Sequence, residues 1–252
     1  MTNLGINKKF FSSWNSKMSY ILGFIVADGC LGVKRIRKRD GGKQYALNIT
    51  SKDRFHLENI KEVMASQQKI CPKYGSYTSK KDYYCIQIGH QEICKNLVKL
   101  GILPRKTYNL SSIKIPEKYF PDFVRGFFDG DGTVYIYNVN QTPQIKAAFI
   151  SPSLNFITEF NRRLCTNLNI PIKTIHQGIP KRTERGMVLY SICFYVDDCE
   201  KLAEFMYGNN SSLYLPRKRR IFEKWKSIKR RHYIKQNYPS KIGWRLNEKV
   251  FA

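Results

Sequence analysis

Two acidic residues, Asp28 and Asp131, are the first candidates for chemistry in this chain of 252 residues. Each ends an apolar segment and is followed by a glycine, in ILGFIVADG (residues 21–29) and VRGFFDGDG (residues 124–132). Both segments are typical of helices that end at the acid. The helix dipole leaves a partial negative charge at a helix C-terminus, so a carboxylate there is repelled. We therefore expect a cation near each acid.

Small residues spaced four apart mark one side of each predicted helix. They are Gly23 and Ala27 in the first helix, and Gly126 and Gly130 in the second. This spacing puts the small residues on one stripe, which lets two helix backbones approach closely. Such a helix pair would bring the two acids together at its end. The alternative is two separate core helices that carry small residues for packing.

Two acids brought together in this way would need a cation between them. Carboxylates about 6 Å apart repel by roughly 3 kcal/mol at an effective dielectric constant near 20. A divalent ion removes that cost, and oxygen ligands without clustered His or Cys favour Mg²⁺, with Mn²⁺ or Ca²⁺ as substitutes. An EF-hand beginning at Asp129 is excluded, because Val134 stands where its glycine belongs and Asn140 where its glutamate belongs.

The charge of the chain points to a polyanionic partner. There are 44 Lys and Arg against 19 Asp and Glu, which gives a net charge of +25. An excess of this size is typical of nucleic-acid binding. A membrane is not favoured as partner, because the sequence has no run of about 18 apolar residues. The N-terminal residues also lack the apolar core of a secretory signal.

The cysteines do not form a recognisable framework. Their number is odd and no pair has the spacing Cys-x-x-Cys, which argues against a set of disulfides and against a zinc site. We expect them to be reduced and mostly buried. The seven are Cys30, Cys71, Cys85, Cys94, Cys165, Cys193 and Cys199.

The elements around the two motifs repeat in the same order. After the first motif we expect strands at 29–39 and 44–50, a helix capped by Asp53, strands at 74–78 and 83–88, and a helix at 91–100. After the second we expect strands at 133–139 and 144–150, a helix capped by Ser153, strands at 172–175 and 187–196, and a helix at 197–207. The tetrapeptide LPRK follows both units, at 103–106 and 215–218.

These patterns predict an α+β protein built from two α-β-β-α-β-β-α units, with two antiparallel sheets flanked by helices. We expect an N-terminal arm at 1–17, repeats at 18–113 and 114–224, and a C-terminal extension at 225–252. The extension interleaves cations with aromatic residues. It is either a further nucleic-acid arm or a segment that packs back on the body.

On these residues, the chain resembles the single-chain LAGLIDADG homing endonucleases over roughly residues 18 to 224. The resemblance implies a duplicated fold with the motif helices at the central interface and a saddle of two sheets that binds double-stranded DNA. It implies a monomer that makes a metal-dependent double-strand break in a long, pseudo-palindromic target during intron homing. Within the family, the last acid of each motif binds metal, which maps onto Asp28 and Asp131.

The resemblance also assigns roles to residues beside the two acids. The backbone carbonyls of Ala27 and Gly130 would contribute to the metal sites. Asp129 matches an earlier motif acid whose role is structural, and Val26 replaces that acid in the first motif.

Two lysines and two serines also match family positions. Lys106 and Lys218 match an active-site lysine late in each repeat, with a solvated cation near the phosphates as the alternative. Ser51 and Ser151 stand where the family carries a polar residue, often Gln, that orders water.

The DNA contacts would come from alternate residues on one face of each sheet. An ordinary solvated face predicts the same alternation, but it does not explain why these positions lack Asp and Glu. Side chains such as Lys, Gln and Asn read base edges in a major groove. The predicted contact residues are Gly32, Lys34, Ile36, Lys38, Gln44 and Asn48 in the first half, and Thr133, Tyr135, Tyr137, Gln144 and Lys146 in the second.

Two other functions remain open from the sequence. Some relatives of this family act as maturases that bind their host intron RNA, and others bind DNA as regulators without cutting it. The presence of both acids and both lysines favours the nuclease. The cell compartment stays open between an organelle and a bacterial cytoplasm.

Overall fold

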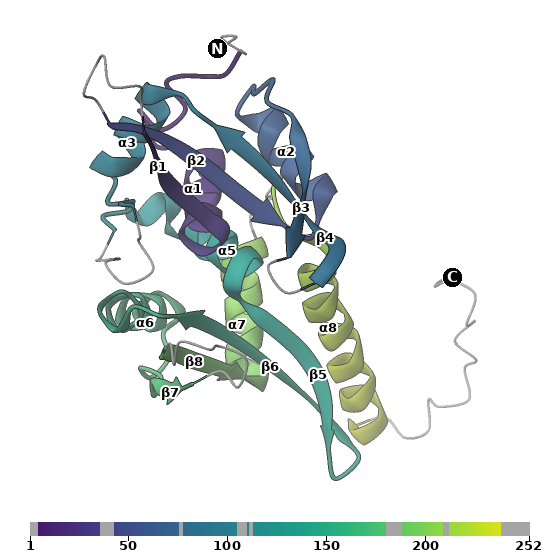
Figure 1. Cartoon of the computed structure of the whole chain (residues 1–252). Helices are drawn as coiled ribbons and strands as arrows, with labels where there is room; N and C mark the ends of the chain where they lie inside the picture. The colour runs from purple at the N-terminus through teal and green to yellow at the C-terminus, as the bar shows by residue number, and fades with distance from the viewer. Residues whose placement is uncertain are drawn as a thin grey trace.

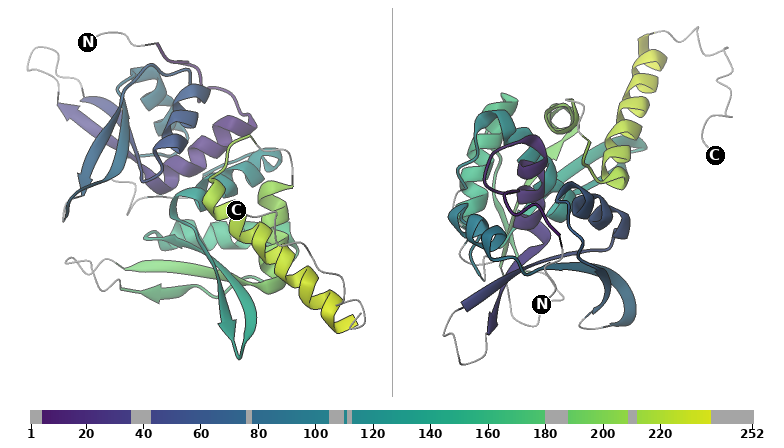
Figure 2. Two further views of the ribbon diagram at one scale, coloured as in Figure 1. Left: turned by 90° about the vertical axis from the view of Figure 1, so that its right-hand side faces the viewer. Right: turned by 90° about the horizontal axis from the view of Figure 1, so that it is seen from above.

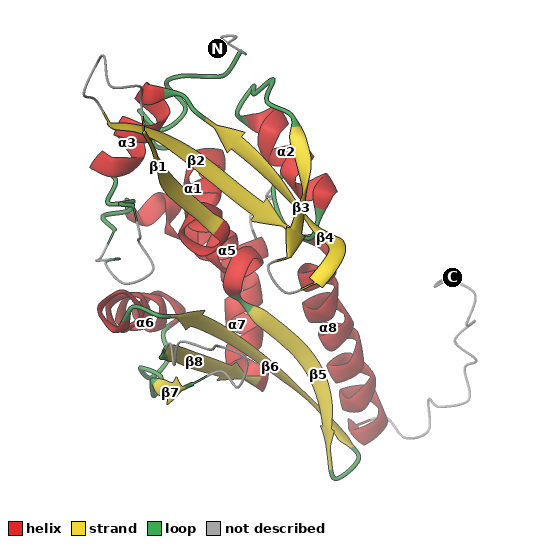
Figure 3. Ribbon diagram, in the orientation of Figure 1, coloured by secondary structure: helices red, strands yellow, loops and turns green. Residues whose placement is uncertain are grey.

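The structure is a computed structural model that describes residues 5–35, 43–75, 78–104, 110, 113–179, 188–208 and 212–237. Two four-stranded antiparallel sheets lie one above the other in Figure 1, and helices lie behind both. Figure 3 shows the same division between strands and helices. The first sheet has the strand order β1-β2-β4-β3, and the second has the matching order β5-β6-β8-β7. The predicted duplicated α+β fold is confirmed.

The first half contains three helices and four strands within the described residues. They are α1 (Ser16–Asp28), β1 (Gly29–Arg35), β2 (Lys43–Ser51), α2 (Arg54–Val63), β3 (Ile70–Gly75), β4 (Thr78–Ile88) and α3 (Gln91–Lys99).

The second half repeats this order and adds a long final helix. Its elements are η1 (Glu117–Tyr119), α5 (Phe120–Asp131), β5 (Thr133–Val139), β6 (Thr142–Ser151), α6 (Leu154–Leu168), β7 (His176–Gly178), β8 (Leu189–Tyr195), α7 (Val196–Tyr207) and α8 (Pro216–Asn237). The boundary expected between 224 and 225 falls inside α8, and the one between 17 and 18 falls inside α1.

Two predicted strands lie elsewhere. The segment 172–175 is not a strand, because the backbone of Lys173 is bonded to a side chain of α6: its N–H donates to Asn161 Oδ1 at 3.3 Å and its carbonyl accepts from Asn161 Nδ2 at 2.6 Å. β7 therefore begins only at His176. In the first half, β3 begins at Ile70, earlier than predicted, and Pro72 is tolerated because β3 is an edge strand. Of the predicted strand 29–39, residues 36–39 lie outside the described residues.

The core lies between the sheets and the helices. Antiparallel register pairs Leu31 with Leu47 and Ile49 with Ile86, and all four side chains are buried on the inner face of the first sheet. The second half has an aromatic core whose rings contact one another at centroid distances of 5.0–5.7 Å, formed by Phe127, Phe149, Phe156 and Phe160. Burial of these faces leaves the opposite faces of both sheets, here called the outer faces, open to a partner.

The helices α1 and α5 form a close seam between the two halves. A Cβ built on Gly126 would overlap the carbonyl oxygen of Tyr20, and one built on Gly23 would overlap that of Phe123. A Cβ on Gly130 would likewise overlap the side chain of Ala27. The predicted contact through small residues is therefore confirmed, and the alternative of two separate core helices is wrong.

The cysteines differ from the prediction in burial. All seven are free, but only Cys94, Cys165 and Cys199 are buried, while Cys30 and Cys71 are exposed. The exposed pair lies in β1 and β3, where alternation turns these positions to the outer face. Within the part of the chain that the structure describes, no helix is both long and apolar enough to cross a membrane.

Candidate functional site

The two motif acids lie at the same end of the helix seam. Asp28 is the last residue of α1 and Asp131 is the last residue of α5. A Cβ on Gly130, which precedes Asp131, would lie 3.5 Å from Asp28 Oδ2. Both carboxylates also favour the charged form of one lysine, Lys218. The predicted meeting of the acids is thus supported by contacts from both helices.

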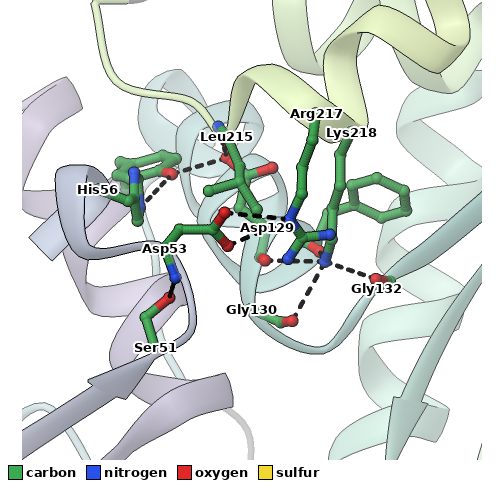
Figure 4. A network of polar contacts seen from close by, with 11 residues as sticks. Ser51, Asp53, His56, Asp129, Gly130, Gly132, Leu215, Arg217 and Lys218 are labelled. Atoms are coloured by element: carbon green, nitrogen blue, oxygen red, sulfur yellow. Dashed lines mark hydrogen bonds and ion pairs between the residues drawn. The ribbon is translucent and has the colours of Figure 1, made fainter. Parts of the chain in front are cut away.

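The cation beside the α5 end is the buried side chain of Lys218. Its Nζ donates to the carbonyl oxygens of Phe128 at 2.7 Å, Asp129 at 2.8 Å and Gly130 at 3.1 Å, and also to that of Gly132 (Figure 4). The first three carbonyls belong to the last turn of α5, where helix geometry leaves acceptors without backbone partners, and that of Gly132 follows directly after the helix. Lys218 is therefore not a solvated cation, and it offsets the negative end of the helix dipole.

Burial lowers the pKa of Lys218 to about 8, while Asp129 opposes this shift. The ammonium is nevertheless the favoured form at neutral pH, because several acceptors surround it. Its repeat partner, Lys106, lies outside the described residues. The expectation of a cation near the α1 end is therefore untested.

Asp129 connects the two halves near the two motif acids. It is 1% exposed, and its Oδ2 accepts from the hydroxyl of Tyr20 and from the backbone N–H of Leu215, both at 2.7 Å. Burial raises the pKa of Asp129 to about 6. The Tyr20 hydroxyl also lies 3.1 Å from Nε2 of His56 on α2. These bonds fit a structural role for Asp129.

Sequence reasoning missed Tyr20 and His56 as partners of this acid. Tyr20 lies three residues before Gly23, and this helical spacing puts it on the side of the seam. His56 carried no signal in the sequence, because its contact depends on how α2 packs against α1.

Ser51 and Ser151 end β2 and β6, and both are buried. The hydroxyl of Ser51 accepts from the N–H of Asp53 at 3.1 Å, and that of Ser151 accepts from the N–H of Ser153 at 3.2 Å. These turns begin the helices that follow. The predicted role of the two serines in ordering water stays a prediction.

Of the two predicted N-terminal helix caps, only that of α6 is present. Ser153 caps α6 as predicted, because its hydroxyl accepts from Phe156 N at 3.3 Å. The carboxylate of Asp53 does not cap α2, and it pairs instead with Arg217 at 3.1 Å. The Arg217 guanidinium at the start of α8 draws the carboxylate away from the α2 N-terminus (Figure 4).

The outer face of the first sheet is polar and comes from all four of its strands. Register pairs Gly32 with Ala46, and the side chain of Asn48 accepts from Gln87 Nε2 at 2.9 Å. Lys73 on β3 donates to Thr50 at 3.3 Å on the same face. Gln87, Thr50 and Lys73 were missed, because the sequence pattern did not give the pairing of β2 with β4 and β3.

Four other predicted contact positions in the first half are only partly described. The backbone of Lys34 pairs with that of Gln44 between β1 and β2. Ile36 and Lys38 lie outside the described residues.

The outer face of the second sheet combines aromatic rings with a lysine. Register pairs Tyr135 with Lys146 and Tyr137 with Gln144, and Thr133 is exposed at the start of β5. The ammonium of Lys146 lies 5.5 Å from the ring centroid of Tyr195, which is 45% exposed and was not predicted. This arrangement offers a cation and flat apolar surfaces to a partner.

The described residues contain no cluster of three or more His, Cys, Asp or Glu side chains suited to a metal. A metal at the seam would therefore be held by the two carboxylates, by backbone carbonyls, and by water or a partner's phosphates. That oxygen set fits Mg²⁺, which keeps several waters in protein sites. The site is thus suited to a hard cation whose remaining ligands are water or the oxygens of an anionic partner.

Comparison with solved structures identifies the fold. The LAGLIDADG homing endonuclease I-GzeII in complex with its DNA target is similar, with a TM-score of 0.55, 10% identity, and coverage of 92% of this chain and 94% of that one. The LAGLIDADG meganuclease I-AabMI bound to uncleaved DNA gives a TM-score of 0.56 at 15% identity, covering 88% and 92%. The meganuclease I-SmaMI bound to DNA gives 0.54 at 14% identity, covering 86% and 90%.

The chain therefore has the fold of a single-chain LAGLIDADG homing endonuclease, with both motif helices at its centre. No protein-family model and no curated protein sequence matches it. At this level of identity the likeness establishes the fold, and the activity must be argued from the site.

Proposed function

We propose that the protein is a site-specific DNA endonuclease that makes a divalent-metal-dependent double-strand break. The observation that supports it best is the meeting of Asp28 and Asp131 at the end of the helix seam, between two polar outer faces. One acid would serve each DNA strand. The fold supports double-stranded DNA as the partner, because similar structures contain bound DNA. We expect the single chain to act as a monomer.

The proposed metal is Mg²⁺, held by Asp28 and Asp131 with the backbone carbonyls of Ala27 and Gly130. The carbonyl of Gly130 also accepts from Lys218, and a carbonyl oxygen has a second lone pair for a metal. When bound, Mg²⁺ would activate a water and stabilise the leaving 3′ oxygen. The two carboxylates would supply the negative charge that holds the ion at the end of the helix seam.

The proposed role of Lys218 is to position the end of α5 and, through it, Asp131. Its hydrogen bonds to successive carbonyls fix the last helical turn, and its charge lowers the cost of bringing two carboxylates and a phosphate together. Lys106, Ser51 and Ser151 remain predicted members of the site.

The outer faces would read the DNA sequence. Asn48 and Gln87 offer amide groups on the first sheet, and Lys146 and Gln144 offer donors on the second. Such side chains discriminate bases in a major groove, while the many other cations hold phosphates. Because the two faces carry different residues in the same architecture, the proposed target is long and imperfectly palindromic.

The experiment incubates the purified protein with Mg²⁺ and a library of duplex DNA sites and sequences the broken ends. Asp28→Asn and Asp131→Asn should each abolish double-strand breaks and leave DNA binding largely intact, because the outer faces need no metal. Asp197→Asn is the control, because this side chain at the start of α7 is exposed, and the variant should cut normally. Undiminished cutting by either motif variant would refute the assignment.

The same experiment separates the remaining functions. DNA binding without breaks by the wild type would indicate a regulator. Binding of structured RNA without DNA breaks would indicate a maturase that acts on its host intron.

A further inference from the structure

The final helix, α8, is the most basic element of the described fold. Its 22 residues, PRKRRIFEKWKSIKRRHYIKQN, contain ten Lys and Arg and one Glu. One side packs on the body through Lys218, Phe222 and Trp225, which are all buried. In Figure 2 the helix starts at the central helices and extends beyond the body on the helix side, away from the strands of the first sheet.

Most described cations of α8 already have partners within the protein. Lys226 pairs with Glu204 at 3.6 Å, and Lys229 pairs with two acids of α7 at 2.9 and 3.0 Å. Arg219 pairs with Glu223 at 2.8 Å. The two lysines attach α8 to α7, whereas the Arg219–Glu223 pair lies within α8; each of these three cations is already paired with an acid.

Arg220 and Lys224 are different. Both are exposed, and neither has an ionic or hydrogen-bond partner among the described residues. They are four positions apart, which places them side by side on one face of the helix. A helix turns by about 100° per residue, so both lie roughly opposite the side of Lys218 and Phe222. This basic stripe therefore faces away from the motif acids.

The stripe lies on the side of α8 opposite the end of α5, beside which the outer faces would hold the target DNA. Lys218 occupies the side of α8 that borders the α5 end, and Arg220 and Lys224 occupy the other side. Its charge is nevertheless unneutralised, and a surface of this sign attracts polyanions. The stripe is thus suited to an anionic ligand other than the DNA held on the outer faces.

We propose that Arg220 and Lys224 form a second DNA-binding site, which holds the phosphates of another duplex segment while the outer faces hold the target. This inference rests on the proposed function, which places the protein among excess duplex DNA. A B-form duplex carries one negative charge per about 1.7 Å of its axis, so two adjacent cations contact it without base readout. Bridging of two segments would let the protein pass between them during its search for a target.

The test uses full-length protein loaded at equal molar ratio on the immobilised target duplex, without divalent metal so that nothing is cut. A labelled duplex of unrelated sequence is then added, and its capture is measured against salt concentration. The wild type should capture the second duplex. Arg220→Gln/Lys224→Gln should lose at least half of this capture, and its log affinity should fall less steeply with log salt, by a slope of about 2.

A matched control removes the same charge from the other side of the helix. Lys226→Gln/Lys229→Gln also loses two cations, but these pair with α7, so capture should stay near the wild-type level. Equal losses in the two double variants would overturn the proposal. So would a preference for a structured RNA hairpin over the second duplex.

Failure of this proposal is distinguishable from failure of the proposed function. If the wild type binds and cuts its target but captures no second duplex, only the second site is refuted. If the wild type binds no target duplex, both proposals are refuted.

Discussion

At the scale of single residues, the buried lysine at the end of α5 decides how the site is held. Lys218 is 5% exposed and provides the cation that an acid at a helix C-terminus requires. The need for that cation was predictable from the position of Asp131. The choice of Lys218 was not predictable from charge alone, because Arg217, Arg219 and Arg220 surround it in the sequence.

Lys218→Met should destabilise the protein by about 3 kcal/mol, because it leaves several buried carbonyls and Asp129 without their cation. Urea unfolding in metal-free buffer measures this loss independently of cleavage. Lys224→Met is the control on the same helix, and as an exposed substitution it should change stability by less than about 0.5 kcal/mol. Equal stability of the two variants would contradict the positioning role of Lys218.

A second residue-scale prediction concerns pH and His56. Burial lowers the pKa of His56 to about 4, against an ordinary value of 6.5. Between pH 4 and 6.5, His56 is therefore mostly protonated in the unfolded chain and mostly neutral in the folded chain. Protonation of His56 should therefore lower the free energy of unfolding by about 3 kcal/mol as the pH falls from 6.5 to 4.

The measurement is the free energy of unfolding of wild type and His56→Gln across this pH range. Asp129 acts in the opposite direction, because its raised pKa makes the folded state bind the extra proton below about 6. The difference between the two proteins isolates the histidine. A difference that does not change with pH would show that His56 is not held neutral.

At the scale of elements, the helix seam was the most predictable part of the fold. Its signal is local, since small residues four apart specify a close backbone contact whatever the partner. The strand at 172–175 was mispredicted because its backbone is satisfied by Asn161 of α6. Gln87 and Tyr195 were missed for a related reason: outer-face neighbours depend on register between strands far apart in sequence.

Gly126→Ala tests the seam directly. The added methyl group would overlap the carbonyl oxygen of Tyr20, so the helices must separate, at a cost of about 3 kcal/mol. Thermal unfolding measures the loss, and cleavage should fall with it because the motif acids move apart. Gly89→Ala is the matched control, since a Cβ there meets no atom within 4 Å. A stable, fully active Gly126→Ala protein would contradict the close packing of α1 and α5.

At the scale of the whole molecule, the two halves share an architecture but differ in detail. The start of α8 connects to both, through Arg217 to Asp53 in the first half and through Leu215 to Asp129 in the second. Only the second motif carries the buried acid, with Val26 at the matching place in the first. The duplication of the fold was predictable from the two motifs. The contacts of the start of α8 with both halves were not, because they join residues more than 80 positions apart in the sequence.

The difference between the outer faces leads to a prediction about the target. Gly32 pairs with Ala46 in the first sheet, and at the matching place Tyr135 pairs with Lys146 in the second. If each sheet reads one half-site, Lys146→Ala should relax base preference in one half-site only, by about 1–3 kcal/mol at the affected base pairs. Asn48→Ala should do the same in the other half-site. Sequencing bound sites from a randomised library measures both. Loss of base preference spread equally over the two half-sites would contradict this division of base recognition between the sheets. It would mean that these side chains contact phosphates and not base edges.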